Sequence, residues 1–266
     1  MEKEGHLVLQ GDCLEVMKKL PSESVDLIIT DPPYNIGLKY IKKYFRDKKD
    51  TGDYVTWLNE RLRECARILK KNGSMYLINY PELNARVLPF LEDELGLKLK
   101  RWMIWNYPTN IGHSPKNWTR SHRSILFLTG GDDYTFNRQK ILQHYKNPEV
   151  KKIRERIENG IAGRTSYDVL RFLDLIEIQK GMIDVQEINL SKNVTKERKK
   201  GHPCQLPFPL MELLVKVSSN PGDVIFDPFA GTFSLSVIAK RLNRKSIGID
   251  IAKKYCKIGK SRIQNG

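Results

Sequence analysis

The chain has 266 residues, of which 40% are hydrophobic and 29% are charged. This length suits one full α/β domain with a modest appendage and excludes two large enzymes. Lysine and arginine outnumber aspartate and glutamate by 46 to 31, which gives a formal net charge of +15 and a pI near 9.6. This charge favours an anionic polymer or surface as partner, although a basic solvated surface on an ordinary enzyme would give the same value.

The cysteines and the amino-terminal residues exclude further classes of protein. Cys13, Cys65, Cys204 and Cys256 lie far apart, without metal-ligand spacing and without a secretory context. The first six residues are mostly charged, and the apolar run after them is short. We therefore expect no metal site, no signal peptide and no membrane span, and a protein that works in a reducing cytoplasm.

Seven short apolar runs predict β-strands that are covered on both faces, because their hydrophobic residues are continuous and do not alternate with polar ones. These runs are residues 7–10, 25–30, 74–78, 101–105, 124–128, 224–226 and 246–249. Helical patterns lie between them, at residues 13–20, 54–69, 209–217 and 235–242. Strands that alternate with helices predict an α/β fold with a doubly wound, mostly parallel, Rossmann-like sheet.

Acidic residues stand at the ends of four predicted strands. Asp12 and Asp31 follow strands in the first part of the chain, and Asp227 and Asp250 follow strands near its end. In parallel sheets, ligands bind at the carboxyl ends of the strands. Four acidic strand ends are hard to explain by packing, so we predict that they mark a binding site.

Residues 132–200 are polar, strongly charged and poor in strand patterns. They contain two basic runs, Lys151–Arg156 and Lys196–Lys200. We interpret the segment as an insertion that docks on an anionic partner, although a solvated helical face would give the same pattern. The chain then divides into residues 1–131, this insertion, and residues 201–266, with the outer two parts forming one domain.

The most informative motif is Asp31-Pro32-Pro33-Tyr34, directly after a buried strand. Two prolines end the strand and stiffen the turn, which leaves Asp31 at the strand end with an aromatic ring just beyond it. The carboxylate and a carbonyl of the turn can accept both N–H bonds of an amino group on a planar ring, and Tyr34 can stack on that ring. These acceptors would localise the nitrogen lone pair for attack on a methyl sulfonium, without a covalent enzyme intermediate. The alternative is a proline-rich turn without a chemical role.

A second motif runs from Phe226 to Thr232, where a turn of small residues follows a strand. Such a turn lets the backbone approach a ligand closely and opens into a helix. Asp250 ends the next strand, at a spacing of about twenty residues that suits hydrogen bonds to ribose hydroxyls. The predicted cofactor-binding residues here are Asp227, Phe229, Ala230, Gly231, Thr232 and Asp250.

Together these motifs resemble the β group of DNA amino-methyltransferases. In that group an Asp-Pro-Pro-Tyr motif comes early, a target-recognition region follows and the cofactor motif comes last, as they do here over nearly the whole chain. The resemblance implies a seven-stranded methyltransferase sheet with circularly permuted motifs and S-adenosyl-L-methionine as cofactor. It also implies that a base is flipped out of double-stranded DNA and methylated on its exocyclic amino group. Residues 132–200 would then form the target-recognition region.

Further segments fit the same family. Asp12 and Cys13 resemble the stretch that reaches the adenine side of the cofactor, and His202 and Gln205 resemble the segment that lines its methionine end. Residues 121–124 resemble a segment near the flipped base, and residues 245–250 resemble the ribose-binding strand.

One position departs from the family pattern. The cofactor turn of the family usually carries a second glycine, where this chain has Phe233. The departure implies either a less tight turn or a phenyl ring that packs beside the ligand.

Basic and aromatic residues follow the Asp-Pro-Pro-Tyr motif between residues 39 and 49. They are Lys39, Tyr40, Lys42, Lys43, Tyr44, Phe45, Arg46, Lys48 and Lys49. Positive charge beside a base-binding turn suits phosphate contact, so we predict a loop that becomes ordered on DNA. A solvated helix with a buried aromatic stripe is the alternative.

Several functions compete with this interpretation. Pro203-Cys204-Gln205 resembles the nucleophilic loop of cytosine-C5 methyltransferases, but it precedes the cofactor strand, whereas their loop follows the strand that carries Asp31 here. Adenine N6 is slightly favoured over cytosine N4, which shares the chemistry. RNA or protein-amide methylation and a non-catalytic DNA-binding module fit the motifs less well. The recognition sequence, a homodimer and a cognate restriction endonuclease stay open.

Overall fold

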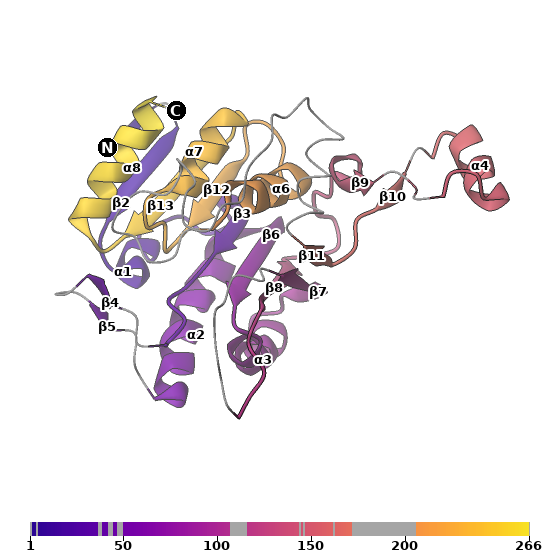
Figure 1. The fold of residues 1–266 in the computed structure, drawn as a ribbon. Coiled ribbons are helices and arrows are strands. Elements are labelled where there is room, and N and C mark those ends of the chain that lie inside the picture. The colour runs from indigo at the N-terminus through magenta and orange to yellow at the C-terminus, as the bar shows by residue number, and fades with distance from the viewer. Residues whose placement is uncertain are drawn as a thin grey trace.

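A computed structural model describes residues 2–3, 5–36, 39–41, 45–46, 50–106, 116–143, 145, 147–161, 163–171 and 206–265. Its centre is a nine-stranded sheet in the order β1-β2-β13-β12-β3-β6-β8-β7-β11, with helices on both faces (Figure 1).

The seven predicted strands are all present and form the middle of the sheet. They are β2 (His6–Gln10), β3 (Val25–Thr30), β6 (Leu69–Asn79), β7 (Lys98–Asn106), β8 (His122–Thr129), β12 (Val224–Asp227) and β13 (Lys245–Asp250). The short strands β1 (Glu2–Lys3) and β11 (Val169–Arg171) extend the two edges. All neighbours pair in parallel except β1 with β2 and β8 with both β6 and β7. The predicted Rossmann-like, mostly parallel sheet is therefore confirmed.

Two layers of helices bury the faces of this sheet. One layer contains α1 (Cys13–Met17), α2 (Thr51–Ile68) and α3 (Pro81–Pro89), which continues into the π-helical turn η1 (Phe90–Glu94). The other contains α6 (Phe208–Ser218), α7 (Ser234–Arg241) and α8 (Lys253–Asn265). The four predicted helices are confirmed, although α1 ends earlier than expected, whereas α3 and α8 were not predicted.

The helix α2 illustrates how the sequence positions a layer. The Asp50 side chain accepts a hydrogen bond from the Gly52 amide at 2.8 Å and caps the helix start. Residues at helical spacing then face the sheet and are buried; they are Tyr54, Leu58, Arg61, Leu62, Cys65 and Ile68. The buried arginine among them has a role at the site described below.

The insertion contains the 3₁₀-helix η2 (Arg138–Ile141), the paired strands β9 (Leu142–Gln143) and β10 (Arg164–Thr165), and the helix α4 (Lys151–Glu158). None of the eight residues of α4 is buried, and the helix projects away from the sheet (Figure 1). The first basic run, Lys151–Arg156, thus lies on an exposed helix. The second basic run, Lys196–Lys200, lies outside the described residues.

The described parts of residues 39–49 form two short antiparallel strands, β4 (Lys39–Ile41) and β5 (Phe45–Arg46), and not the helix considered as an alternative. None of the described helices is both long enough and apolar enough to cross a membrane.

Candidate active site

Four acidic side chains lie at one edge of the sheet. Asp12 follows β2, Asp250 ends β13, Asp227 ends β12 and Asp31 follows β3. These four strands are consecutive neighbours and run in parallel. Their carboxyl ends therefore meet at the same edge, and the four predicted acidic strand ends are brought together in a row.

The turn of residues 31–34, here called the Pro-Pro turn, is held from inside the protein. Pro32 is buried. The Tyr54 hydroxyl on α2 donates a hydrogen bond of 2.6 Å to the Pro33 carbonyl oxygen, and the Asn79 side chain donates to that hydroxyl at 3.3 Å. The chain leaves the turn through Asn35, whose φ of 59° lies in the left-handed region that asparagine tolerates better than most residues. The turn is therefore fixed by α2 and β6 before any ligand binds.

Tyr34 is folded back onto the Pro-Pro turn. Its hydroxyl donates a hydrogen bond to Oδ1 of Asp31, and only 4% of the residue is exposed. The Tyr80 ring lies 5.2 Å from the Tyr34 ring, centroid to centroid, and the Arg123 guanidinium lies 4.5 Å above the Tyr34 ring. The ring expected to stack on a substrate is thus covered by protein, and its hydroxyl occupies one acceptor atom of the carboxylate.

The buried carboxyl groups at this edge have raised pKa values. Burial raises the pKa of Asp31 to about 7, against the lowering effects of the Tyr34 hydrogen bond and the Arg123 charge. Burial raises the pKa of Asp227 to about 8, and the charges of Asp31 and Asp250 add to that rise. The pKa of Asp250 rises to about 6, again through burial. Three neighbouring carboxylates that resist ionisation favour a positively charged ligand.

Asp250 and the turn of residues 227–232, here called the small-residue turn, are joined by hydrogen bonds. The Asp250 carboxylate accepts from the Gly231 amide at 3.1 Å and from the Ala252 amide at 2.7 Å. The Asp227 carboxylate accepts from the Phe229 amide at 2.9 Å. Each carboxylate oxygen has more than one acceptor position, so these bonds leave both groups able to accept from a ligand.

The other predicted cofactor residues of this turn differ in what they offer. Ala230 is buried, and the Phe229 ring packs 5.8 Å from the Trp57 ring of α2. Thr232 is 3% exposed, and its side-chain oxygen accepts a hydrogen bond of 2.9 Å from Arg262 on α8. The Thr232 side chain thus faces the helix layer, and its carbonyl oxygen also accepts a hydrogen bond of 2.8 Å from Arg262.

Phe233 is fully buried and points away from the sheet edge. Its φ of 59° lies in the left-handed region that favours glycine. A Cβ atom added to Gly248 would lie 2.7 Å from the Phe233 ring, and one added to Gly259 would lie 2.3 Å from it. Two glycines, on β13 and α8, therefore make room for the ring, which packs in the core and not beside a ligand.

Asp12 and Cys13 occupy the start of α1. Asp12 caps that helix by accepting from the Leu14 amide at 2.9 Å, and both of its carboxylate oxygens lie 3.1 Å from Nη2 of Arg61. Burial raises the pKa of Cys13 to about 12, so its thiol is a poor nucleophile. Sequence patterns missed Arg61; an arginine on the apolar face of α2 is the signal that could have revealed it.

His202, Cys204 and Gln205 lie outside the described residues. Of the segment expected near a flipped base, residues 121–124, the structure places Arg123 above Tyr34.

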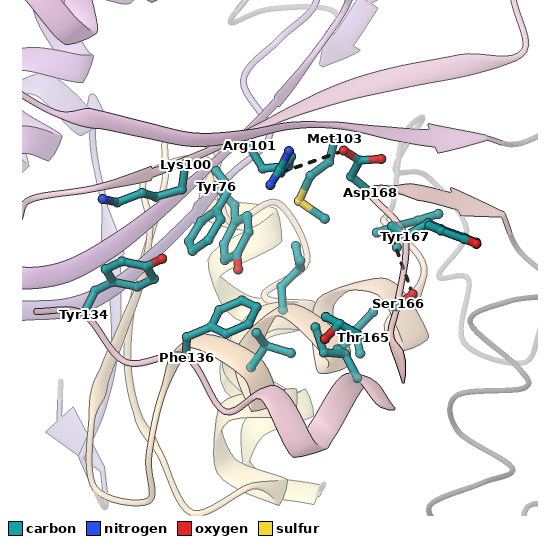
Figure 2. Close-up of a pocket in the computed structure, with 16 residues that line it drawn as sticks. Tyr76, Lys100, Arg101, Met103, Tyr134, Phe136, Thr165, Ser166, Tyr167 and Asp168 are labelled. Carbon is teal, nitrogen blue, oxygen red and sulfur yellow. Dashed lines mark hydrogen bonds and ion pairs between the residues drawn. The ribbon is translucent and has the colours of Figure 1, made fainter. Parts of the chain in front are cut away.

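A cavity of about 530 Å³ lies elsewhere, between the sheet, α6 and the insertion (Figure 2). Its walls are mainly apolar and aromatic and include Tyr76, Phe127, Tyr134 and Phe136. None of the four aspartates at the sheet edge lines it. The cavity shows how the first part of the insertion packs on the sheet, but it is separate from the candidate active site.

Comparison with known proteins adds independent information. The family model for DNA methylases matches residues 25–261. DNA adenine methyltransferase YhdJ of Escherichia coli K12 is 32% identical over 263 residues, which cover 98% of this chain and 83% of that protein. Type II methyltransferase M.HpaI of Haemophilus parainfluenzae is 31% identical over 256 residues, which cover 96% of this chain and 73% of that protein.

Solved structures share the fold. The cytosine-N4-specific PvuII DNA methyltransferase superposes with a TM-score of 0.67 at 18% identity, over 95% of this chain and 84% of that one. The M1.HpyAVI–SAM complex gives a TM-score of 0.65 at 21% identity, over 97% and 98% of the two chains. Identities this low support a common architecture and say nothing about the target base.

Proposed function

The chain belongs to the DNA methylase family of N6-adenine and N4-cytosine methyltransferases, and within that family we propose that its target is adenine N6 in double-stranded DNA. It is therefore a DNA amino-methyltransferase. The proposal of adenine rests on YhdJ, the relative named as an adenine methyltransferase. Cytosine N4 is the second candidate, because the same turn offers acceptors that suit either amino group.

The methyl donor is S-adenosyl-L-methionine, which supplies an electrophilic methyl group on a positively charged sulfur when it is bound. The residues at the sheet edge suit this ligand. Asp227 and Asp250 are raised-pKa carboxylates beside a small-residue turn, and a cationic ligand would stabilise their ionised forms. We assign Asp250 to the ribose hydroxyls and the turn of residues 227–232 to the amino-acid part of the cofactor.

Asp31 performs the central step in our proposal. A base amino group is a poor nucleophile because its lone pair is delocalised into the ring. A hydrogen bond to the Asp31 carboxylate, with a second to a carbonyl of the Pro-Pro turn, pulls the nitrogen towards tetrahedral geometry and localises its lone pair for attack on the methyl group. The S–CH₃ bond would break as the N–CH₃ bond forms, and the nitrogen would then lose one proton. The carboxylate also stabilises the positive charge that develops on the nitrogen. The same two acceptors align the amino group, so no covalent bond to the enzyme is needed.

Access to Asp31 requires the base to leave the DNA helix, because a stacked and paired amino group cannot reach a strand end inside the protein. Tyr34 then needs to release Asp31 and turn its ring towards the base. The observation that carries this proposal is the Asp31–Tyr34 pair at the end of β3, beside Asp227. A planar ring with an amino group suits this pair, because the ring can stack on Tyr34 while the amino group donates to Asp31.

We propose that residues 132–200 form the target-recognition region that binds DNA. We also propose that the enzyme acts in the cytoplasm. M.HpaI is named a type II methyltransferase, and a cognate restriction endonuclease is the corresponding proposal for this chain. An assay for cleavage of unmethylated host DNA tests for such an endonuclease. Sedimentation of the purified protein tests separately whether it forms a homodimer.

Mass spectrometry of nucleosides tests the assignment. DNA is incubated with the enzyme and the cofactor carrying a labelled methyl group, and it is then digested. Labelled N6-methyladenine supports the proposal, and labelled N4-methylcytosine establishes the second candidate. Labelled 5-methylcytosine would contradict the role of Asp31. An Asp31→Ala variant that binds the cofactor serves as control and should leave the DNA unlabelled.

A further inference from the structure

We propose that Arg123 is a positioning residue for methyl transfer: it keeps the Tyr34 ring beside the Pro-Pro turn in the free enzyme and supplies the positive charge that keeps Asp31 an acceptor for the target amino group. The inference rests on the proposed role of Asp31. It assigns a function to a residue that no sequence motif singled out individually.

The topology of the sheet brings Arg123 to the site. Arg123 is the second residue of β8, which runs antiparallel to both of its neighbours, β6 and β7. The beginning of β8 therefore lies at the edge where the parallel strands end. Ser124, the next residue, is in register with Asn79 at the end of β6, and Tyr80 follows Asn79. Had β8 run parallel, this arginine would lie at the opposite edge.

Arg123 contacts two aromatic rings. Its guanidinium carbon lies 4.5 Å from the centre of the Tyr34 ring and 4.1 Å from the centre of the Tyr80 ring. The two rings are themselves 5.2 Å apart and inclined at 48°. A cation at these distances is attracted by the electron-rich ring faces, and a planar guanidinium can contact both rings. Arg123 thus joins the Tyr34 ring to Tyr80 at the start of α3.

The charge of Arg123 also acts on Asp31. Burial raises the pKa of Asp31, while the Tyr34 hydrogen bond and the Arg123 charge lower it. On the neighbouring strand β12, the charges of Asp31 and of Asp250 on β13 raise the pKa of Asp227. Among the described residues that shift the pKa of Asp31, Arg123 supplies the positive charge.

An arginine is suited to this task because its side chain stays protonated when it is buried, whereas a lysine can lose its proton. Protonation of Asp31 would remove one of its acceptor oxygens and replace it with a donor. The amino group of the base would then lose the partner that localises its lone pair. Arg123 therefore widens the pH range in which the turn can act.

The chain offers a matched control. Arg120 lies 3.8 Å above the same Tyr80 ring and forms an ion pair with Glu82. Arg120 is not among the groups that shift the pKa of Asp31. Arg120→Met therefore removes a cation from Tyr80 without removing the charge beside Asp31, whereas Arg123→Met removes both contacts to the rings and that charge.

The test measures single-turnover methylation across a range of pH for the wild type, Arg123→Met, Arg123→Lys and Arg120→Met. We expect Arg123→Met to move the acidic limb of the rate profile to higher pH by about one unit or more, the size of effect that a neighbouring arginine charge has on the pKa of an aspartate. Arg123→Lys should leave the limb in place but lower the plateau, because it keeps charge and loses the planar contact. Arg120→Met should leave the limb unchanged.

A second measurement needs no DNA or cofactor. Carboxyl ¹³C resonances report the Asp31 pKa in the free protein, with Asp31→Asn used to assign the signal. The inference is overturned if folded Arg123→Met shows the wild-type limb and the wild-type Asp31 titration, or if Arg120→Met moves the limb equally. If Arg123→Met does not fold, a wild-type plateau in Arg123→Lys overturns the positioning role. Full methylation by Asp31→Ala would instead reject the proposed function itself.

Discussion

Tyr34 donates its hydroxyl hydrogen to Oδ1 of Asp31, three residues earlier in the same turn. The side chain proposed to stack on the base therefore occupies an acceptor that the base amino group needs. Binding of the target must exchange one hydrogen bond for another and expose the ring of a residue that is 4% exposed in the free protein. The free enzyme thus holds its two central side chains against each other.

Substitutions of Tyr34 separate its ring from its hydroxyl. Tyr34→Ala should lower kcat/KM on duplex DNA, because a lost aromatic stack costs about 1–3 kcal/mol per base. Tyr34→Phe keeps the ring and frees Asp31, so its rate at high pH should stay near that of the wild type. The hydroxyl lowers the pKa of Asp31, so Tyr34→Phe should raise that pKa. As the pH falls, the variant should therefore lose activity at a higher pH than the wild type does. Equal losses for both variants at every pH would contradict this division.

Asp31→Ala should abolish methyl transfer and leave cofactor binding largely intact, because the carboxylate contacts the target amine and not the cofactor. Isothermal titration and a labelled-methyl assay measure the two effects. Cys204→Ser is the matched control for mechanism, since amino methylation needs no thiolate and the variant should stay active. An inactive but folded Cys204→Ser that binds the cofactor, together with a covalent adduct trapped by 5-fluorocytosine DNA in the wild type, would show methylation of carbon.

Periodicity in the sequence predicts the sheet well, because strands buried on both faces carry uninterrupted apolar runs such as residues 25–30 and 224–226. It does not predict α8, whose thirteen residues include exposed lysines and a glycine. The buried face of that helix has few large apolar residues, namely Tyr255, Cys256 and Ile263. They form a buried face only because the helix packs against β2 and β13.

Part of the candidate site could also be predicted from the sequence. Acidic strand ends and the Pro-Pro turn follow from local sequence, because a turn after a buried strand has a fixed location in a parallel sheet. Arg123 does not follow from it: an arginine at a strand start is typical of a surface. Its place above Tyr34 depends on β8 running antiparallel between β6 and β7, which is a long-range property.

Cofactor affinity should depend on pH through Asp227 and Asp250, whose pKa values are raised to about 8 and about 6. As the pH falls through this window both groups become neutral, so binding of a positively charged cofactor should weaken. Titration calorimetry at several pH values measures the effect. Asp250→Ala should weaken binding by about 1.5–3 kcal/mol for each charge-assisted hydrogen bond that is lost. Unchanged affinity in the folded variant would contradict the assignment to the ribose.

The stability of the free protein should change with pH in the opposite sense. The folded-state pKa of Asp227 lies above the value of an unfolded chain, near 4, so the folded state binds the proton more tightly. Its stabilising contribution is present below about pH 4 and is lost as the pH rises through about 8. Asp227→Asn should therefore raise the melting temperature relative to the wild type at high pH more than at low pH. The same difference at both pH values would exclude this ionisation as the cause.

The helix α4 should contribute to DNA affinity through its four basic residues, which are all exposed. Replacing Lys151, Lys152, Arg154 and Arg156 with alanine should weaken DNA binding and flatten its salt dependence, since each lost phosphate contact changes the slope of log K against log salt by about 0.9. The matched control replaces four exposed lysines of α8, at positions 253, 254, 257 and 260, on the opposite side of the molecule (Figure 1). Equal effects of both variants would show general charge attraction without a role for α4.

Phe233 and Gly259 should be energetically coupled. Alanine in place of glycine within a helix ordinarily stabilises it by about 1 kcal/mol. At Gly259 the added methyl would lie 2.3 Å from the ring of Phe233, which is fully buried and cannot move aside. Gly259→Ala should therefore destabilise the protein, by about 1–3 kcal/mol for an overpacked core, whereas Lys260→Ala on the exposed face of α8 should have little effect.

The double variant tests the contact directly. Phe233→Gly alone leaves a cavity. It also relieves backbone strain, because a residue with a side chain at the left-handed φ of 59° costs roughly 1–2 kcal/mol and glycine does not. In Phe233→Gly with Gly259→Ala, the new methyl occupies part of that cavity. Urea unfolding should thus show a loss of stability smaller than the sum of the two single losses by about 1 kcal/mol or more. Because the ring points into the core, Phe233→Gly should leave cofactor affinity nearly unchanged. Additive losses would show that Gly259 is not needed to accommodate the Phe233 ring. A large change in cofactor affinity would show that Phe233 contributes to the cofactor site.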